Sequence, residues 1–314
     1  QSATNTWLIY RKSFAVTNVP NQLIARIAAD SKYWLWINDQ LVIFEGGLKR
    51  GPSPSGTYYD PVDIAPYLTK GSNTIAILLW HFGKDGFSHI NSGKAALLFE
   101  AIAPGLEIVS DASWQCALYE AYQNTEAPFP NYRMPESNIR FDARQAITNW
   151  NRTSFEGSLP GAVCVGKAGK APFGDLVERP IPQWKNSGLL SYVSVRESLR
   201  GDTLFCRLPY NAQITPYLKV EAEAGKTIHI RMDNYEGGSE RNVRAEYITR
   251  EGEQEYESYG WMNGHEVYYI IPEGVKVLDV KYRETGYNTD LAGSFHCDDP
   301  FYDELWQRSA RTLY

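Results

Sequence analysis

Apolar and polar residues alternate with a period of two along much of this chain, and this pattern limits its fold more than any other feature. The stretch 227–232 reads Thr-Ile-His-Ile-Arg-Met, and one apolar face recurs in the same way in 23–27, 75–79 and 278–282. Glycine- and asparagine-containing turn signals separate these stretches. Such alternation is typical of half-buried strands in antiparallel sheets, and short strands separated by turns favour sandwiches. The sequence therefore predicts an all-β fold of antiparallel β-sandwiches.

The length of 314 residues is about twice the ~150 that one domain usually takes, so two domains are expected. The segment 124–183 is rich in proline and shows little alternation. Because a bare loop of that length is improbable, we expect an ordered connection that lies over a sandwich. We predict a first domain over 1–182, which includes this connection, and a second β-sandwich over 183–296.

The final segment, 297–314, has a different pattern. Asp299 can cap a helix that has Pro300 at its first position. Tyr302, Trp306, Ala310 and Leu313 follow at helical spacing, with Leu305 beside them, and form one apolar face. A helix with such a face and no partner helix in the sequence is expected to be the first helix of a further, truncated helical domain.

Composition excludes several classes of protein. Lys and Arg number 31 against 37 Asp and Glu, a net charge of −6, so no cationic surface for nucleic acid is expected. The longest apolar runs fall far short of the ~20 residues that span a membrane. Because the N-terminus begins without Met or a signal layout, we expect a secreted or periplasmic protein whose signal was removed.

Metal, nucleotide and nucleophile motifs are weak. The 4 cysteines contain no CxxC pair, so the usual zinc site is excluded, and buried thiols are favoured over a disulfide. The segment 161–168 ends in Ala where a P-loop needs Ser or Thr, so a surface loop is favoured over phosphate binding. The histidines lack metal spacing, and no G-x-S-x-G elbow marks a nucleophilic serine. No metal and no cofactor is expected.

Pairs of neighbouring carboxylates were weighed as glycosidase catalysts, which need two such groups. They are Asp60/Asp63, Asp298/Asp299 and Asp303/Glu304. The first pair lies in a turn and the second is explained by helix capping, so none is predicted to be a catalytic pair.

Aromatic residues are abundant, with 21 Tyr, 12 Phe and 9 Trp. In 33–37 both faces of a strand would be apolar, which favours a buried central strand over a sugar platform. The loop 80–87 is the better candidate for ligand contact, because its glycines leave it free to adapt and it offers aromatic and charged groups together. The predicted carbohydrate-binding residues are Trp80, Phe82, Asp85 and Phe87.

Two groups of motifs resemble known families. The stretches 33–42, 59–64 and 68–76 resemble the galactose-binding-like jelly roll, which often precedes catalytic domains in bacterial glycosidases. The stretches 245–265, 282–287 and 293–313, with the Asp-Ala-Arg element at 142–144, are similar to the second sandwich and following helix of α-L-rhamnosidases of glycoside hydrolase family 78. The resemblance covers nearly the whole chain and is most specific from 245 to 314.

This resemblance implies a function for a longer parent enzyme. The parent would hydrolyse terminal α-L-rhamnosides by inversion, with its carboxylates in an (α/α)₆ barrel that begins where this sequence ends. No residue here inherits a catalytic role, so the chain alone is expected to be inactive. Its expected partners are its own C-terminal barrel and carbohydrate. The alternatives are an autonomous carbohydrate-binding protein and, more remotely, an assembly module without a sugar site.

Overall fold

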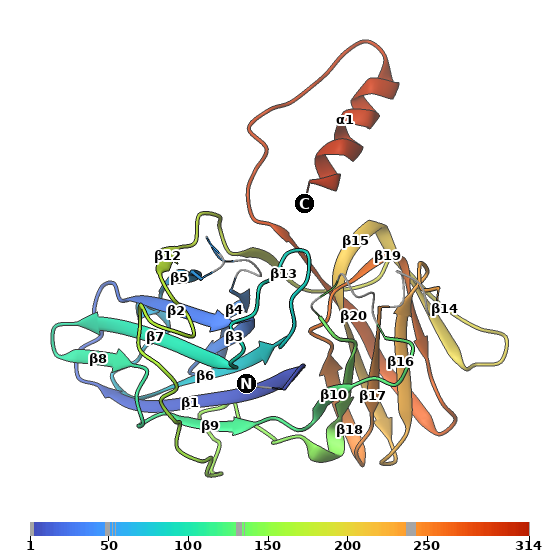
Figure 1. Ribbon diagram of the computed structural model, residues 1–314. Coiled ribbons are helices and arrows are strands. Elements are labelled where there is room, and N and C mark those ends of the chain that lie inside the picture. Colours follow the sequence, from blue (N-terminus) through green and yellow to red (C-terminus); the bar gives the residue numbers. More distant parts are fainter. Residues whose placement is uncertain are drawn as a thin grey trace.

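A computed structural model describes residues 3–47, 51, 53, 55–129, 134, 136–236 and 243–313. Two β-rich bodies lie side by side, with the helix α1 (Pro300–Thr312) standing apart from both (Figure 1). Two short 3₁₀ helices, η1 (Ala65–Tyr67) and η2 (Ala143–Gln145), lie in connections. The predicted all-β sandwich fold is confirmed.

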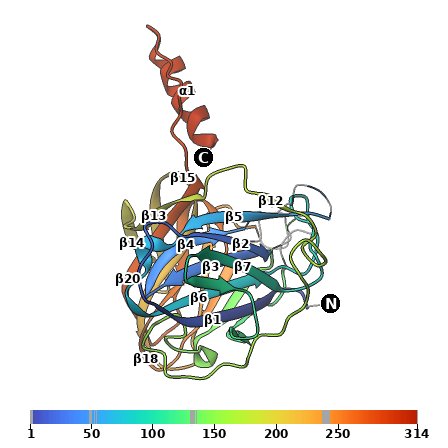
Figure 2. The same ribbon diagram turned by 90° about the vertical axis from the view of Figure 1, so that its left-hand side faces the viewer.

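The first sandwich consists of two five-stranded sheets (Figure 2). The first sheet has the order β4 (Gln40–Gly46), β3 (Lys32–Ile37), β6 (Gly71–His81), β1 (Thr6–Val16) and β9 (Gln115–Leu118). The second has the order β12 (Leu176–Glu178), β5 (Thr57–Asp63), β2 (Ile24–Asp30), β7 (Ala96–Ala103) and β8 (Leu106–Val109). All pairings are antiparallel except that of β12 with β5.

Strand β3 is buried on both faces, as its sequence predicts. Tyr33, Leu35 and Ile37 face the core between the two sheets, whereas Trp34 and Trp36 belong to a second core on the opposite face. Strand β3 lies between β4 and β6 in its sheet, so its main-chain groups are paired on both edges. The tryptophans therefore serve packing and not a surface.

The remaining strands form one ten-stranded sheet that folds over on itself. Its order is β10 (Tyr122–Asn124), β11 (Ile139–Asp142), β17 (Arg244–Ile248), β16 (Thr227–Met232), β19 (Met262–Ile270), β15 (Thr203–Ala222), β20 (Val275–Tyr287) and β13 (Trp184–Leu190), with β14 (Ser194–Glu197) and β18 (Gly252–Glu257) also on β15. The 20-residue strand β15 pairs with β14 and β19 near its start and with β18 and β20 near its end. Because β15 belongs to both layers of the sheet, the sheet closes into the second sandwich.

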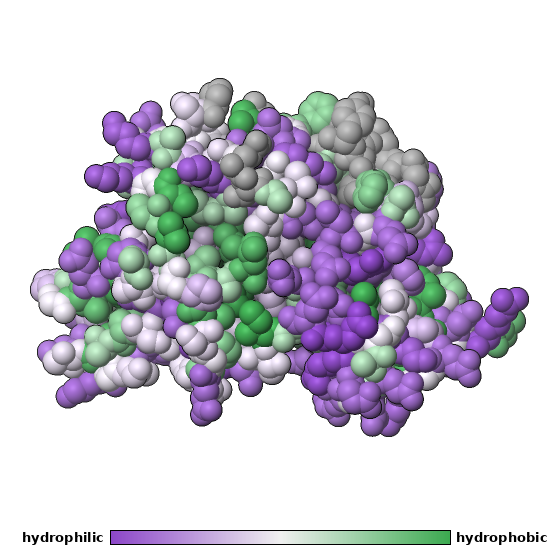
Figure 3. Space-filling model, turned by 60° about the horizontal axis from the view of Figure 1, so that its bottom comes forward, coloured by the Kyte–Doolittle hydropathy of each residue, from purple (hydrophilic) through white to green (hydrophobic). Residues whose placement is uncertain are grey.

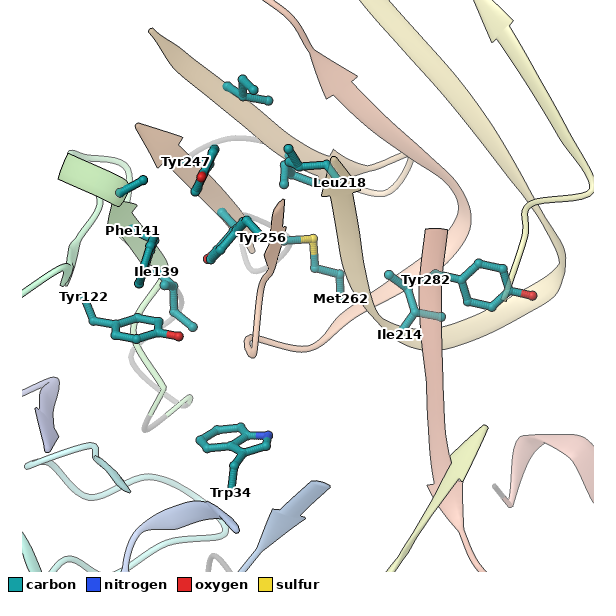
Figure 4. Close-up of a cluster of buried hydrophobic side chains, with 14 of the residues drawn as sticks. Trp34, Tyr122, Ile139, Phe141, Ile214, Leu218, Tyr247, Tyr256, Met262 and Tyr282 are labelled. Carbon is teal, nitrogen blue, oxygen red and sulfur yellow. The ribbon is translucent and has the colours of Figure 1, made fainter. Parts of the chain in front are cut away.

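Strand β10, at the start of the proline-rich connection, and strand β11, within it, join the ten-stranded sheet. Strand β11 pairs parallel to β17, and Phe141 packs on Tyr256 with ring centres 5.2 Å apart (Figure 4). Tyr122 of β10 stacks on Trp7 of the first sandwich at 3.9 Å. One apolar core therefore runs through both bodies. The boundary at 182/183 stays a prediction, and these strands lie on its N-terminal side.

Helix α1 begins as the sequence predicts. The Asp299 carboxylate accepts a hydrogen bond from Phe301 N at 2.9 Å, and Pro300 occupies the first turn. No residue of α1 within the described chain is buried, and Phe301 and Leu305 are 63% and 48% exposed. The Arg311 guanidinium lies 4.2 Å from the ring centre of Tyr210 in β15, so the helix end is near the second sandwich.

Candidate functional site

A buried polar cluster lies at one corner of the first sandwich, where β2 ends and β3 begins. Ser31 alone separates these strands, so the chain passes from one sheet to the other at this point. Asp30 ends β2, His81 ends β6, and His89 follows in the loop to β7. All four side chains are buried.

The Asp30 carboxylate is the centre of this cluster. It accepts hydrogen bonds from Ser31 Oγ and from the backbone N–H of Ser92, both at 2.6 Å. His81 Nδ1 lies 3.2 Å and His89 Nε2 3.5 Å from Asp30 Oδ1. Ser31 Oγ is also 3.2 Å from His89 Nε2 and accepts a hydrogen bond from Phe82 N. The carboxylate is therefore held in place by groups from both sheets and from the loop.

These contacts decide the ionisation of Asp30. Burial by itself raises the pKa of this carboxyl, but the nearby imidazoles of His81 and His89 and the hydrogen bond from Ser31 Oγ outweigh burial. The pKa of Asp30 is therefore held far below its ordinary value. A carboxylate that is ionised at neutral pH is a strong hydrogen-bond acceptor.

A small polar hollow opens beside this cluster. Its volume is about 60 Å³, and its lining includes Asp30, His89, Asn91, Ser92 and Thr57. A water needs roughly 10–15 Å³ on this measure, so the hollow has room for a few waters or for a hydroxyl-bearing edge of a ligand. Carboxylate, imidazole, amide and hydroxyl groups together suit polyol hydroxyls, which both donate and accept.

The four residues predicted to contact carbohydrate do not form one exposed surface, although the rings of Trp80 and Phe82 pack edge-on with their centres 5.0 Å apart. Trp80 and Phe82 are fully buried, and Trp80 Nε1 donates to Asn5 Oδ1 at 2.8 Å, so neither offers a surface to a sugar. The Asp85 carboxylate accepts hydrogen bonds from the backbone and side chain of Asn91 and shapes the loop. Phe87 lies in the turn between the bridged residues Gly86 and His89 and is 72% exposed. Sugar contact by Asp85 and Phe87 stays a prediction.

Sequence reasoning did not single out Asp30 or His89. The one available signal was an acidic residue directly after the apolar run 27–29, at the buried end of the strand. His89 carried no signal, because it is 59 positions from Asp30 and only the fold brings them together.

Most of the carboxylates that were considered as catalytic pairs make structural contacts. Asp60 is buried and pairs with Arg179 at 3.2 Å and with Tyr33 Oη at 2.7 Å. Asp63 accepts from the backbone of Leu23 and Ala65. In 298–304, Asp299 caps α1, Asp303 accepts from Cys297 N, and Glu304 pairs with Arg308. These contacts give Asp60, Asp63, Asp299, Asp303 and Glu304 structural roles.

A second buried charge cluster lies between the sandwiches. Lys32 Nζ is 3.0 Å from Glu45 Oε1 and 3.7 Å from Glu136 Oε1, and it lies 3.9 Å from the ring centre of Trp261. The Lys32 and Glu45 side chains are each 2% exposed. Because the pair is sealed from solvent, we infer a structural role for it. It links the first sandwich to Trp261, the residue directly before β19.

The described ranges contain neither a metal-binding cluster nor a membrane-spanning helix. No group of three or more His, Cys, Asp or Glu side chains there is placed to hold a metal ion. None of the helices in those ranges is long and apolar enough to cross a membrane. The cysteines Cys116, Cys164, Cys206 and Cys297 are all free thiols.

Comparison with known proteins shows which solved structures share this fold. No family model and no curated protein matches the sequence. A GH78 family rhamnosidase of Bacillus sp. GL1 superposes with a TM-score of 0.86 and 17% identity over 99% of this chain and 56% of its own. An α-L-rhamnosidase of Dictyoglumus thermophilum is also similar, with a TM-score of 0.70 and 21% identity over 95% of this chain and 34% of its own. An α-L-rhamnosidase of Aspergillus terreus has a TM-score of 0.67 and 19% identity over 97% of this chain and 37% of its own. The chain thus spans about a third to a half of these proteins, and its fold is that of the β-sandwich part of family 78 rhamnosidases.

Proposed function

We propose that this chain is the non-catalytic β-sandwich part of an α-L-rhamnosidase-like glycoside hydrolase. One observation carries the proposal: the whole described fold, and not one module of it, is similar to a part of several rhamnosidases. In this proposal the parent enzyme hydrolyses terminal α-L-rhamnosides by inversion, with its carboxylates in an absent helical barrel. The secreted or periplasmic location stays a prediction.

The role of the chain in this proposal is to support that barrel. Helix α1 presents Phe301, Tyr302 and Leu305, which are 63%, 51% and 48% exposed, and further helices would cover them. Arg311 on Tyr210, whose hydroxyl donates to Glu284 at 2.8 Å, would fix the helix end against the second sandwich. The sandwiches would then bury one flank of the barrel.

Activity measurements test this proposal. The 314-residue chain should not hydrolyse an aryl α-L-rhamnoside, whereas the polypeptide encoded by the full reading frame should. Turnover by the chain alone would contradict the non-catalytic role. A reading frame that stops directly after Tyr314 would contradict the proposal that a barrel follows.

We infer a second, finer role in carbohydrate contact, favoured by the polar hollow. The ionised Asp30, with His89 and Asn91, offers acceptors and donors to sugar hydroxyls, and the exposed ring of Phe87 lies two residues from His89. If no catalytic domain exists, this contact would make the chain an autonomous carbohydrate-binding protein.

Calorimetry on the chain tests this contact. Rhamnose and rhamnose-containing oligosaccharides should release heat at millimolar concentration, and His89→Ala and Phe87→Ala should each weaken binding. His265→Ala, a change at a side chain 64% exposed on the second sandwich, is the matched control and should bind as the wild type does. No heat from the wild type would contradict the sugar contact and leave the scaffold role standing.

A further inference from the structure

A mainly apolar hollow of the first sandwich is separate from the polar cluster. Its volume is about 430 Å³, within the range of small-molecule sites. Strands β1 and β9 of one sheet form one wall, strand β7 of the other sheet forms the second, and the segment 160–173 covers it. Apolar surface gathers over the first sandwich in Figure 3, beside a more hydrophilic second sandwich.

The hollow exists because β8 is short. Strand β8 pairs only with Glu100–Ala103 of β7, so on this edge of β7 no described strand continues beside 95–98, whereas β2 pairs with 96–98 on the other edge. Phe99 marks the last bonded position, where its N–H donates to Ser110 Oγ and its C=O accepts from Ser110 N. Because bonding directions alternate along a strand, the N–H and C=O of Leu97 point to this same open side.

The covering segment leaves a gap over this open edge. Ala162 N donates to Trp114 O and Cys116 N donates to Pro160 O, which attach the segment beside β9. Further along, Phe173 packs with Ala96 and Ala28 on the outer face of the second sheet. The segment therefore passes around the edge of β7 and leaves a half-open hollow there instead of filling it.

The lining is suited to an uncharged ligand. Aliphatic and aromatic side chains dominate it, including Leu8, Leu97, Leu118, Val165 and Phe173. Asp111, the one ionisable carboxylate in this lining, is paired with Lys12 at 3.5 Å and bonded to Ser113. Burial raises the pKa of the Cys116 thiol to about 11, so this group is neutral as well.

We propose that this hollow is a binding site for a neutral, mainly apolar small molecule, an alkyl chain or ring carrying one hydroxyl or carbonyl group. The apolar part would lie between Leu8 and Leu118 on one wall and Leu97 on the other, and its polar group would bond the main chain of Leu97. Binding would remove the apolar lining and the apolar part of the ligand from water, which is the main favourable contribution expected here. The site is independent of the proposed glycosidase role.

Binding of the neutral dye N-phenylnaphthylamine tests the site on the whole chain. Its fluorescence should rise on binding, and decanol should displace it, whereas rhamnose and decanoate should not. Val165→Trp fills the hollow from the cover and should weaken dye binding by about tenfold or more, the loss of roughly 1.4 kcal/mol of contact. Val193→Trp, at a residue 64% exposed on the second sandwich, is the matched control and should change nothing.

Each outcome decides the proposal. Equal dye binding by Val165→Trp and the wild type would place the dye elsewhere and overturn the site, as would the absence of any binding. Displacement by decanoate as strongly as by decanol would overturn the preference for a neutral ligand. Leu97→Trp fills the hollow from the strand side, and loss of dye binding in this variant with an unchanged far-ultraviolet spectrum would support the same site.

Discussion

Asp30 shows how a single residue acquires its properties from the fold. Its carboxylate is 7% exposed and contacts Ser31, His81, His89 and the backbone of Ser92. A charge is costly to bury unless it is paired and hydrogen-bonded, and this one is both. The sequence showed only an acidic residue after an apolar run, since two of its partners come from 51 and 59 positions away and local pattern cannot report them.

Replacement of Asp30 by Asn should lower the free energy of unfolding by about 2–4 kcal/mol, because His81 and His89 lose their charged partner within the protein. Urea denaturation measures this. Asp290→Asn, at an exposed position, is the control and should be neutral within about 0.5 kcal/mol. Equal stability of the two variants would show that the cluster contributes nothing.

The same contacts predict a dependence on pH. Because the pKa of folded Asp30 lies below its unfolded value of about 3.9, its contribution is fully present above that pH and is lost as the pH falls towards the folded pKa. The facing titratable groups are His81 and His89. The stability advantage of wild type over Asp30→Asn should therefore shrink below about pH 4. An advantage that stays constant from pH 6 to pH 3 would contradict this assignment.

Thiol reactivity should follow burial. Burial raises the pKa of Cys116 to about 11 and that of Cys206 to about 12, so at pH 8 about one thousandth or less of either is thiolate. Cys164 is exposed and should give the fast phase with a disulfide reagent. Cys164→Ser should remove that phase, and its persistence would place the reactive thiol elsewhere.

At the scale of elements, prediction succeeded where one strand carries its own pattern. Alternation correctly indicated the two apolar faces of β3, and Asp299 followed by Pro300 correctly placed the start of α1. It failed for β10 and β11, which have 3 and 4 residues: β10 pairs with β11, and β11 pairs with β17, about 100 positions later. Strands that short show no period, and their pairing depends on tertiary contacts.

The cap of α1 is a testable element. Asp299→Ala removes the acceptor of Phe301 N and should destabilise the helix by about 1 kcal/mol. Hydrogen exchange of the α1 amides should become faster. Asp298→Ala, at the preceding exposed residue, should leave exchange unchanged. Equal exchange in both variants would show that the cap does not stabilise α1.

At the scale of the molecule, the two sandwiches share one core. Trp7 of β1 stacks on Trp80 and on Tyr122, and Tyr122 packs edge-on against Phe141, 4.7 Å away. Arg140 of β11 is bonded to Glu246 of β17 at 2.7 Å, a partly buried ion pair that holds β11 in the ten-stranded sheet. We therefore expect the bodies to unfold together.

Phe141→Ala should lower the free energy of unfolding by about 3–5 kcal/mol, since it empties space in this shared core. Protection of amides against hydrogen exchange should fall in β6 of the first sandwich as well as in β19 of the second. Phe87→Ala, at a ring 72% exposed, is the control and should have little effect. Loss of protection in β19 alone would mean that the sandwiches unfold separately.

The path of the chain through the sheets limits how its gene can be divided and recombined. From β9 it leaves the first sandwich to place β10 and β11 beside β17, returns to place β12 beside β5, and only then enters β13. No single cut yields two complete units: a gene fragment that begins at 183 lacks two strands of its own sheet. Recombination between relatives should therefore have exchanged this pair of sandwiches as one cassette, and chimeras should be joined outside it.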